Sequence, residues 1–297
     1  MRVFVTGSSG HLASVLLPRL CADPAVEHVR GIDLKVPRFR HPRFEAIVAD
    51  TRDPALPGLL DGCDSLVHLA FVVLRGRMPA SVMREINVEG TRAVFRAARR
   101  AGLRRLIHLS SAAVYGSGSD IPEDAPLAPL RGFLYASHKA EVESMLEREY
   151  PEAVRLRPHA ILGPDAQPLL LRLLRQPCYL RHRQGDARLQ CVHEDDVADA
   201  VLLALTREVR GPFNLAAHGS FSFAEAIRRR RRLSLGLPPR VARAGVGVAW
   251  RVFGWGGEPA WIDGLSRTLT LDCARARAEL GWHPQHGIDA TLAAALA

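Results

Sequence analysis

Short apolar runs alternate with longer amphipathic segments through the first two thirds of the chain. The runs predict strands at 2–6, 28–33, 44–50, 65–70, 105–110 and 153–158. The segments between them have helical spacing and predict helices at about 11–22, 79–101, 135–149 and 195–207. The run 66–70 is nearly continuous in apolar residues, as expected where helices cover both faces of a sheet. The alternation therefore predicts an α/β fold with a parallel sheet.

A glycine turn follows the first predicted strand and opens the first predicted helix. Residues 6–13 read Thr-Gly-Ser-Ser-Gly-His-Leu-Ala. Gly7 permits the turn, Gly10 permits close approach of a phosphate, and Ala13 stands where a third glycine would pack the helix on the strand. Such a turn directs backbone N–H groups from a helix N-terminus at a pyrophosphate. The pattern indicates a dinucleotide-binding βαβ unit.

Two acidic strand ends extend this prediction. Asp33 ends the second strand, where its carboxylate can accept hydrogen bonds from an adenosine ribose and repel a 2′-phosphate. This favours NAD over NADP, although basic residues lie close by: Lys35, Arg38 and Arg40. Asp50 and Thr51 end the third strand, where they would hold the adenine edge or form a simple turn.

The spacing of prolines and glycines changes after residue 158, where they divide the chain into shorter elements. We therefore expect a doubly wound Rossmann sheet with helices on both faces and a smaller C-terminal substrate lobe. The NAD-binding domain would comprise residues 1–158, with 189–217 returning to it. The substrate lobe would comprise residues 159–188 and 218–297.

Composition excludes several classes of protein. The 297 residues are 47% hydrophobic and 24% charged, which is typical of a globular chain. The longest apolar stretches are too short to span a bilayer, and the residues before the first predicted strand lead us to expect no signal peptide. We expect a cytoplasmic protein with no membrane partner. The five cysteines are scattered and have no metal-ligand spacing, and the pair His283 and His286 is expected to be an exposed turn, so no metal is predicted.

The formal charge of +9 raises the possibility of nucleic-acid binding, most strongly at the arginine run 228–232. The basic residues of the chain include only two lysines, Lys35 and Lys139, a bias more typical of codon preference than of a binding patch. We therefore expect the run to be a solvated helix face and no nucleic-acid partner. The scarcity of lysine also suggests a chemical reason for Lys139, because lysine has a tunable pKa that arginine lacks.

Three residues form a candidate catalytic group. Tyr135 and Lys139 are four positions apart and lie on one face of the predicted helix. A tyrosine phenol is a weak base at neutral pH, and a nearby cation that stabilises phenolate brings it closer to its working range. Ser111 follows the carboxyl end of a predicted strand, the edge at which open α/β sheets bind ligands.

These pieces together resemble an extended short-chain dehydrogenase/reductase of the NAD-dependent epimerase/dehydratase family. Further matching segments run in family order to near the end of the chain: His68-Leu69-Ala70, residues 87–91, Arg157-Pro158, Gly163-Pro164, residues 192–198, residues 213–215 and residues 279–284.

The resemblance implies Ser111, Tyr135 and Lys139 as the catalytic residues and NAD as the cofactor. It also implies a longer set of cofactor contacts: Gly7, Ser9, Gly10, His11, Leu12, Asp33, Asp50, Thr51, Leu69, Ala70, Phe71, Asn87, Tyr135, Lys139 and Pro158. In the family, the tyrosine takes a proton from a substrate hydroxyl while a hydride passes to the nicotinamide. A homodimer built from the helices near 84–101 and 136–149 is implied as well.

Three positions depart from parts of the family. Ala112 and Ala113 stand where the dehydratase branch carries an acid pair, which argues against dehydration. Ala160 stands where many sugar-nucleotide enzymes have asparagine, and the arginine that binds the diphosphate is shifted, with Arg188 the nearest candidate. These departures leave the redox chemistry intact.

The leading hypothesis is a nucleotide-sugar epimerase that acts through a transient keto intermediate, with a nucleotide sugar as its small-molecule substrate. The alternative is an NAD(P)-dependent dehydrogenase or reductase of a sugar or of a hydrophobic alcohol or ketone. The aromatic segment 240–261, with Trp250, Trp255 and Trp261, bears on this choice as an apolar substrate wall, an amphipathic surface helix or small-lobe core. An idle NAD(H)-sensing relative is a further alternative that the intact catalytic residues disfavour.

Overall fold

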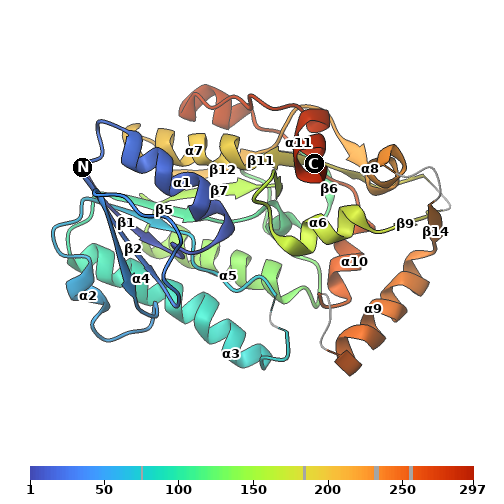
Figure 1. Ribbon diagram of the computed structural model, residues 1–297, viewed down its shortest axis with the longest axis horizontal. Helices are drawn as coiled ribbons and strands as arrows, with labels where there is room; N and C mark the ends of the chain where they lie inside the picture. The colour runs from blue at the N-terminus through green and yellow to red at the C-terminus, as the bar shows by residue number, and fades with distance from the viewer. Residues whose placement is uncertain (75, 183–184, 231–233, 254–256) are drawn as a thin grey trace.

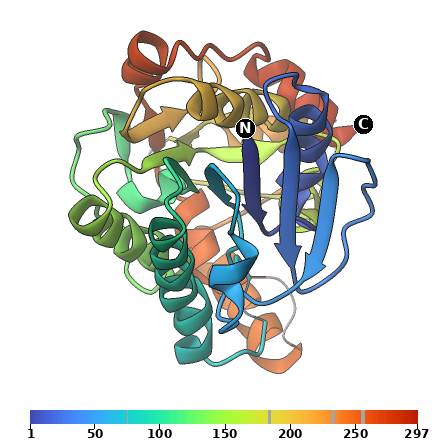
Figure 2. The ribbon, with the colours of Figure 1, turned by 90° about the vertical axis from the view of Figure 1, so that its left-hand side faces the viewer.

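The computed structural model describes all of the chain except residues 75, 183–184, 231–233 and 254–256 (Figure 1). Its centre is a parallel sheet of seven strands in the order β12-β7-β5-β4-β1-β2-β3. The strands are β1 Arg2–Thr6, β2 His28–Asp33, β3 Phe44–Val48, β4 Ser65–His68, β5 Arg105–Leu109, β7 Val154–Pro158 and β12 Gly211–Leu215. Figure 2 shows β1, β2 and β3, in blue, side by side at one edge. The chain order reverses between β1 and β4, and such a switch point opens a crevice at the carboxyl ends of the strands.

Helices cover both faces of this sheet, as the apolar runs predict. Helices α1 (His11–Ala22) and α7 (Glu194–Thr206) lie above it in Figure 1, and α4 (Gly90–Arg100) and α5 (Leu134–Glu149) lie below. Successive side chains of β1 reach opposite layers, because Val3 and Val5 pack in one apolar cluster and Phe4 packs in the other. The predicted doubly wound Rossmann sheet is confirmed.

The predicted helix 79–101 is continuous but not uniform. It comprises α3 (Ala80–Arg84), a π-helical turn (Glu85–Glu89) and α4. The turn carries the fully buried Asn87. Single π-helical turns are frequent at functional sites, and this one lies behind the loop that follows β4.

The remaining elements are short and gather at the end of the molecule away from the N-terminus (Figure 1). Their strands pair as β8 (Ala160–Leu162) with β11 (Cys191–His193), β9 (Cys178–Leu180) with β14 (Leu235–Leu237), β10 (Arg188–Leu189) with β13 (Phe221–Ser222), and β6 (Gly118–Ile121) with β15 (Leu269–Leu271). Their helices are α6 (Pro168–Arg175), α8 (Phe223–Arg230), α9 (Pro239–Phe253), α10 (Ala260–Leu265) and α11 (Ile288–Leu296). Short turns complete the chain: α2 (Leu56–Leu59), a 3₁₀ turn (Ala112–Tyr115) and a π turn (Ala276–Leu280). Two of these pairings, β8 with β11 and β6 with β15, join segments assigned to different lobes, and the division into two lobes stays a prediction.

Helix α8 ends at Arg230, so part of the arginine run lies outside the described residues. Within it, the Arg228 guanidinium donates to the Tyr179 hydroxyl at 2.7 Å. No helix in the described part of the chain is long and apolar enough to cross a bilayer.

Candidate active site

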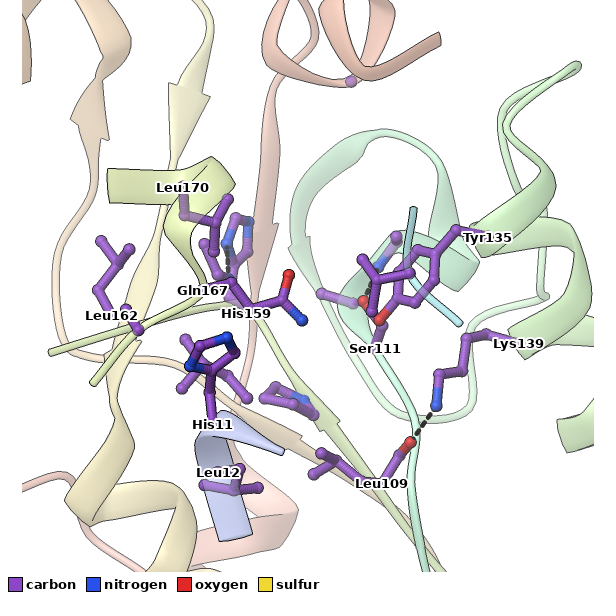
Figure 3. A pocket seen from close by; sticks show the side chains of 18 of the residues that line it. His11, Leu12, Leu109, Ser111, Tyr135, Lys139, His159, Leu162, Gln167 and Leu170 are labelled. Carbon is purple, nitrogen blue, oxygen red and sulfur yellow. Dashed lines mark hydrogen bonds between the residues drawn. The ribbon is translucent and has the colours of Figure 1, made fainter. Parts of the chain in front are cut away.

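A cavity of about 350 Å³ lies at the carboxyl ends of the sheet strands, between the glycine turn and the short C-terminal elements (Figure 3). Its lining brings together many of the residues predicted from sequence: Gly7, Gly10, His11, Leu12, Leu69, Phe71, Ser111, Tyr135, Lys139 and Pro158. The other predicted contacts lie outside this lining: Ser9, Asp33, Asp50, Thr51, Ala70 and Asn87. We refer to the part next to the glycine turn as the cofactor side and to the part formed after residue 158 as the substrate side.

The glycine turn fits a dinucleotide closely. Gly7 has a φ of 75°, and a Cβ there would lie 2.7 Å from the backbone nitrogen of Ala70. A Cβ on Gly10 would lie 3.1 Å from the carbonyl oxygen of Gly7. Gly7 therefore requires glycine, and a side chain at Gly10 would be in tight contact with the turn; the two missing side chains leave the N-terminus of α1 open to a pyrophosphate.

Asp33 supports the same turn. One carboxylate oxygen accepts the N–H of Ser9 at 3.0 Å, and the other accepts the N–H of Leu34 at 2.7 Å. Asp33 therefore fixes the turn and stays half-exposed beside it. Asp50 is engaged differently, because hydrogen bonds from Arg52 hold its side chain and lower its pKa.

The loop 69–72 forms a second wall of the cofactor side. The N–H of Ala70 points at the Thr6 hydroxyl at 3.3 Å, which ties the start of the loop to β1. Asn87 holds the other end through both of its amide atoms: Oδ1 accepts the N–H of Val72 at 2.7 Å, and Nδ2 donates to the carbonyl of Val72 at 3.0 Å. Asn87 therefore acts on the cavity through the backbone of this loop.

Ser111 and Tyr135 lie side by side in the cavity wall (Figure 3). Ser111 precedes the 3₁₀ turn, and its hydroxyl accepts the N–H of Ala113 at 3.2 Å. Burial raises the pKa of the Tyr135 phenol, and a hydrogen bond with Ser111 opposes this rise. At neutral pH the phenol is therefore protonated and held beside the serine hydroxyl.

Lys139 lies one helical turn beyond Tyr135 and is 3% exposed. Its ammonium donates to the carbonyl oxygen of Leu109 and lies 3.7 Å above the ring of Phe71. Burial lowers the pKa of Lys139 to about 7, and the charge of Glu143 opposes this shift. The ammonium is thus held in the cavity wall in a form that is easily deprotonated.

A buried acid joins the two catalytic segments from below. Glu143, a further turn along α5 and 1% exposed, accepts a hydrogen bond from Ser110, the neighbour of Ser111. The N–H at Nε of the Arg157 guanidinium also donates a bifurcated hydrogen bond to both carboxylate oxygens of Glu143, at 2.9 and 3.0 Å. The Ser110 hydrogen bond ties the end of β5 to α5, and hence the serine segment to the helix of the tyrosine, while Arg157 ties Glu143 to β7.

Trp261 from α10 covers the tyrosine. Its ring stacks on that of Tyr135 with centroids 5.9 Å apart and an angle of 23°, and Phe133 packs edge-on against it at 4.8 Å. Segment 240–261 was expected to be a substrate wall, a surface helix or core, and Trp261 lies in the cavity wall. Helix α9 instead carries exposed valines, and Trp255 lies outside the described residues.

The substrate side is mostly apolar. Leucine, isoleucine, alanine and phenylalanine side chains dominate it: Ile161, Leu162, Ala166, Leu170, Leu173, Leu174, Leu189, Phe221, Phe223, Leu265 and Leu269. The charged residues among the described lining of the whole cavity are Lys139, Asp165 and Glu194, with no arginine. Sequence reasoning missed this surface because its members come from many short elements and share no motif.

Strand β10 separates the cavity from a second, polar hollow. Leu189 faces the cavity, whereas Arg188 lines the hollow on the other side, as alternation along a strand requires. The guanidinium of Arg188 is bound there by Glu225 at 3.0 Å and by the backbone carbonyl of Ser220. The nearest candidate for a diphosphate-binding arginine therefore points away from the cavity.

One group in the described part of the chain has the composition of a metal site. Ligand atoms of His193, Asp195 and His286 lie within 4.8 Å of one another. The two imidazole rings, however, are stacked at 4.0 Å and 21°, so their in-plane lone pairs do not converge, and Arg19 lies 3.2 Å from Asp195. His286 is half-buried against His193 rather than fully exposed, and we assign it no metal.

The parallel sheet, the glycine turn and the strand-end cavity define a dinucleotide-binding Rossmann enzyme. The family model for the NAD dependent epimerase/dehydratase family matches residues 3–216, and the chain belongs to that family. The predictions of the family, the fold class, an enzyme and NAD as the cofactor are confirmed at this level.

Curated relatives cover nearly the whole chain. A protein of Stigmatella aurantiaca named 4-hydroxy-2-methyl-3-oxo-4-farnesyl-3,4-dihydroquinoline-1-oxide ketoreductase is 30% identical over 98% of this chain and 95% of its own. An uncharacterized protein of Mycobacterium tuberculosis (strain CDC 1551 / Oshkosh) is 30% identical over 95% of this chain and 80% of its own.

Solved structures share the fold. MoeE5 in complex with UDP-glucose and NAD has a TM-score of 0.77 at 21% identity, covering 100% of this chain and 97% of its own. DesIV, a dTDP-glucose 4,6-dehydratase from Streptomyces venezuelae, has a TM-score of 0.74 at 26% identity, covering 100% of this chain and 96% of its own.

Proposed function

We propose that this protein is an NAD-linked oxidoreductase that interconverts an apolar ketone and its secondary alcohol. The observation that carries the proposal is the apolar substrate side of the cavity, which begins directly beside Ser111 and Tyr135. Binding an apolar substrate there is favourable, because the apolar surfaces of the substrate and of the cavity are removed from water. The Stigmatella aurantiaca relative, named a ketoreductase of a farnesyl-bearing compound, supports this choice.

The charges of the cavity disfavour a nucleotide sugar. A diphosphate needs cationic or multiple N–H partners once it leaves water. The described lining of the substrate side contributes two carboxylates, Asp165 and Glu194, while Arg188 is bound to Glu225 behind β10. The nucleotide-sugar epimerase predicted from sequence stays a prediction, because a fold shared with UDP-sugar enzymes does not determine the substrate.

The three central residues have distinct roles in the proposed reaction. NAD, when bound, accepts the hydride from the alcohol carbon or, in its reduced form, returns it. The Ser111 hydroxyl positions the reacting oxygen by a hydrogen bond. Tyr135 gives its phenolic proton to the carbonyl oxygen during reduction and takes it back during oxidation. Because burial keeps this phenol protonated, its resting form suits reduction.

Lys139 and the walls of the cofactor side complete the arrangement. The Lys139 ammonium lowers the energy of the tyrosinate that forms when the proton leaves, and it would hold the nicotinamide ribose. The glycine turn with Ser9, His11 and Leu12 would hold the pyrophosphate. The remaining proposed cofactor contacts are Asp33 at the ribose, Asp50 and Thr51 at the adenine, and Leu69, Ala70, Phe71, Asn87 and Pro158 along the nicotinamide half.

A direct assay tests the proposal. Purified protein is mixed with NADH and β-tetralone, an apolar bicyclic ketone, and separately with UDP-glucose. We expect stoichiometric loss of NADH absorbance with the ketone, and neither NADH consumption nor sugar interconversion with UDP-glucose. Interconversion of the sugar without net NADH change, together with an inert ketone, would show the epimerase instead.

The assembly and the location of the protein stay predictions from the sequence. We keep a homodimer through helices near 84–101 and 136–149, and a cytoplasmic location, as proposals. Size-exclusion chromatography with light scattering tests the dimer.

A further inference from the structure

Most polar side chains on the substrate side are already satisfied by the protein. His159 uses both ring nitrogens on backbone groups: Nε2 donates to the carbonyl of Leu269 at 3.0 Å, and Nδ1 accepts an N–H at 2.8 Å. Gln190 donates to two backbone carbonyls and accepts one N–H at 2.7 Å. Neither side chain has a group to spare for a ligand.

The carboxylates are also accounted for. Glu194 is 4% exposed and accepts the N–H of Asp165 at 3.0 Å. The Asp165 side chain is exposed, so water solvates it. The side chains of Ser111 and Tyr135 form a hydrogen bond with each other at the reaction centre.

Gln167 is the exception. It is half-buried, precedes α6 as the residue at its N-terminus and makes no side-chain cap to that helix. No described residue hydrogen-bonds its carboxamide. Figure 3 shows this carboxamide pointing into the cavity from the substrate side, towards Ser111 and Tyr135. Its neighbours in the lining are leucines, including Leu162 and Leu170.

This isolation has a physical consequence. A primary amide offers two donors and one acceptor, and an apolar ligand that displaced its water would leave all of them unsatisfied. A ligand that supplies an oxygen at this point avoids that cost. A single hydrogen-bonding group in an apolar pocket orients a ligand, because only one placement satisfies it.

From this geometry we propose that Gln167 is the specificity-determining residue of the substrate side, and that the substrate is an apolar ketone bearing a second oxygen. The reacting carbonyl lies at Ser111 and Tyr135, and the second oxygen, a hydroxyl or carbonyl, hydrogen-bonds the Gln167 carboxamide across the cavity. This inference rests on the proposed ketone reduction and adds the substrate class to it.

The test compares β-tetralone with its phenolic derivatives, which carry a hydroxyl at each ring position in turn. We expect one isomer to be reduced by the wild-type enzyme with a kcat/KM about tenfold above that of β-tetralone. Gln167→Leu replaces the amide by an apolar side chain of similar volume and should reduce this selectivity ratio by about tenfold. Leu170→Ala, in the helix that Gln167 precedes, is the control, because it removes apolar contact from all of these ketones and should leave the ratio intact.

Thermal melting establishes that both variants are folded before their ratios are compared. An equal preference for all isomers in the wild-type enzyme, or a preference that survives in Gln167→Leu, would overturn the inference while reduction of β-tetralone still upholds the proposed function. A raised KM for NADH with an unchanged ratio would also overturn it, because Gln167 would then face the cofactor. If no tetralone is reduced, the proposed function fails and the inference fails with it.

Discussion

The two sides of the cavity are built by different means. The cofactor side consists largely of backbone at the ends of neighbouring strands, shaped by Gly7 and Gly10. The substrate side consists of side chains from short elements scattered between Pro158 and Leu269. Backbone shaped by glycine binds one kind of ligand in one way, whereas an apolar side-chain surface changes with each substitution. The comparison predicts that variants on each side affect different kinetic constants.

The largest effect is expected where the two sides meet. Tyr135→Phe removes the proton donor and keeps the ring that packs on Trp261, so kcat for ketone reduction should fall about a thousandfold. NADH binding, measured by calorimetry, should change by less than about threefold, because the ring shape is kept. Tyr150→Phe, outside the cavity, is the control and should keep its activity. Full hydride transfer in Tyr135→Phe would sink the mechanism.

A substitution in the glycine turn should affect the cofactor side alone. Gly7→Val places a branched side chain at a φ of 75° and against the backbone of Ala70. NADH affinity should fall by about a hundredfold, since a strained conformation of this kind costs up to about 3 kcal/mol. The KM for ketone, extrapolated to saturating NADH, should stay near its original value. A raised ketone KM would show that the two sides are not independent.

Removing the aromatic ring that covers Tyr135 should affect the substrate side and leave the cofactor side unchanged. Trp261→Ala deletes the ring that stacks on Tyr135 and opens the substrate side to water. The KM for β-tetralone should rise about tenfold, while NADH affinity is retained. Steady-state kinetics in both substrates separates these effects. Weaker NADH binding with an unchanged ketone KM would assign Trp261 to the cofactor instead.

The smallest effect concerns stability. Burial lowers the pKa of Lys139 from 10.5 to about 7, so between these values the unfolded chain binds more protons than the folded one. The contribution of Lys139 to the free energy of unfolding should therefore increase as the pH rises from about 7 to 10.5. Below that range its buried ammonium destabilises the folded protein.

Lys139→Met removes this contribution. The increase in Tm between neutral and alkaline pH should be smaller in the variant than in the wild-type protein, by about a few degrees. Lys35→Met, at the exposed lysine, is the matched control, because its charge is solvated in both states. If the Tm of all three proteins depends on pH in the same way, the buried ammonium of Lys139 does not destabilise the folded protein.

The same contrast explains what the sequence could predict. Six of the seven sheet strands were predicted to within two residues at each end, because they are local apolar runs. The seventh, the edge strand β12 (Gly211–Leu215), was not predicted as a strand. The cofactor residues and Ser111, Tyr135 and Lys139 follow short motifs at strand ends. Trp261 stayed ambiguous and Gln167 was missed, because their positions in the cavity depend on how α10 and α6 pack, which no local pattern records. The π-helical turn at Asn87 was missed as well, since one extra residue per turn leaves the apolar pattern of a helix nearly unchanged.

The two faces of β10 have a consequence for how this enzyme could change its substrate. Leu189 and Arg188 are neighbours in sequence, and a strand that slips by one residue exchanges its faces. A slip of β10 by one residue against β13 would thus carry a guanidinium into the cavity and a leucine out of it. A route from the proposed apolar ketones to anionic substrates is therefore one register shift away, with no need to alter the catalytic residues.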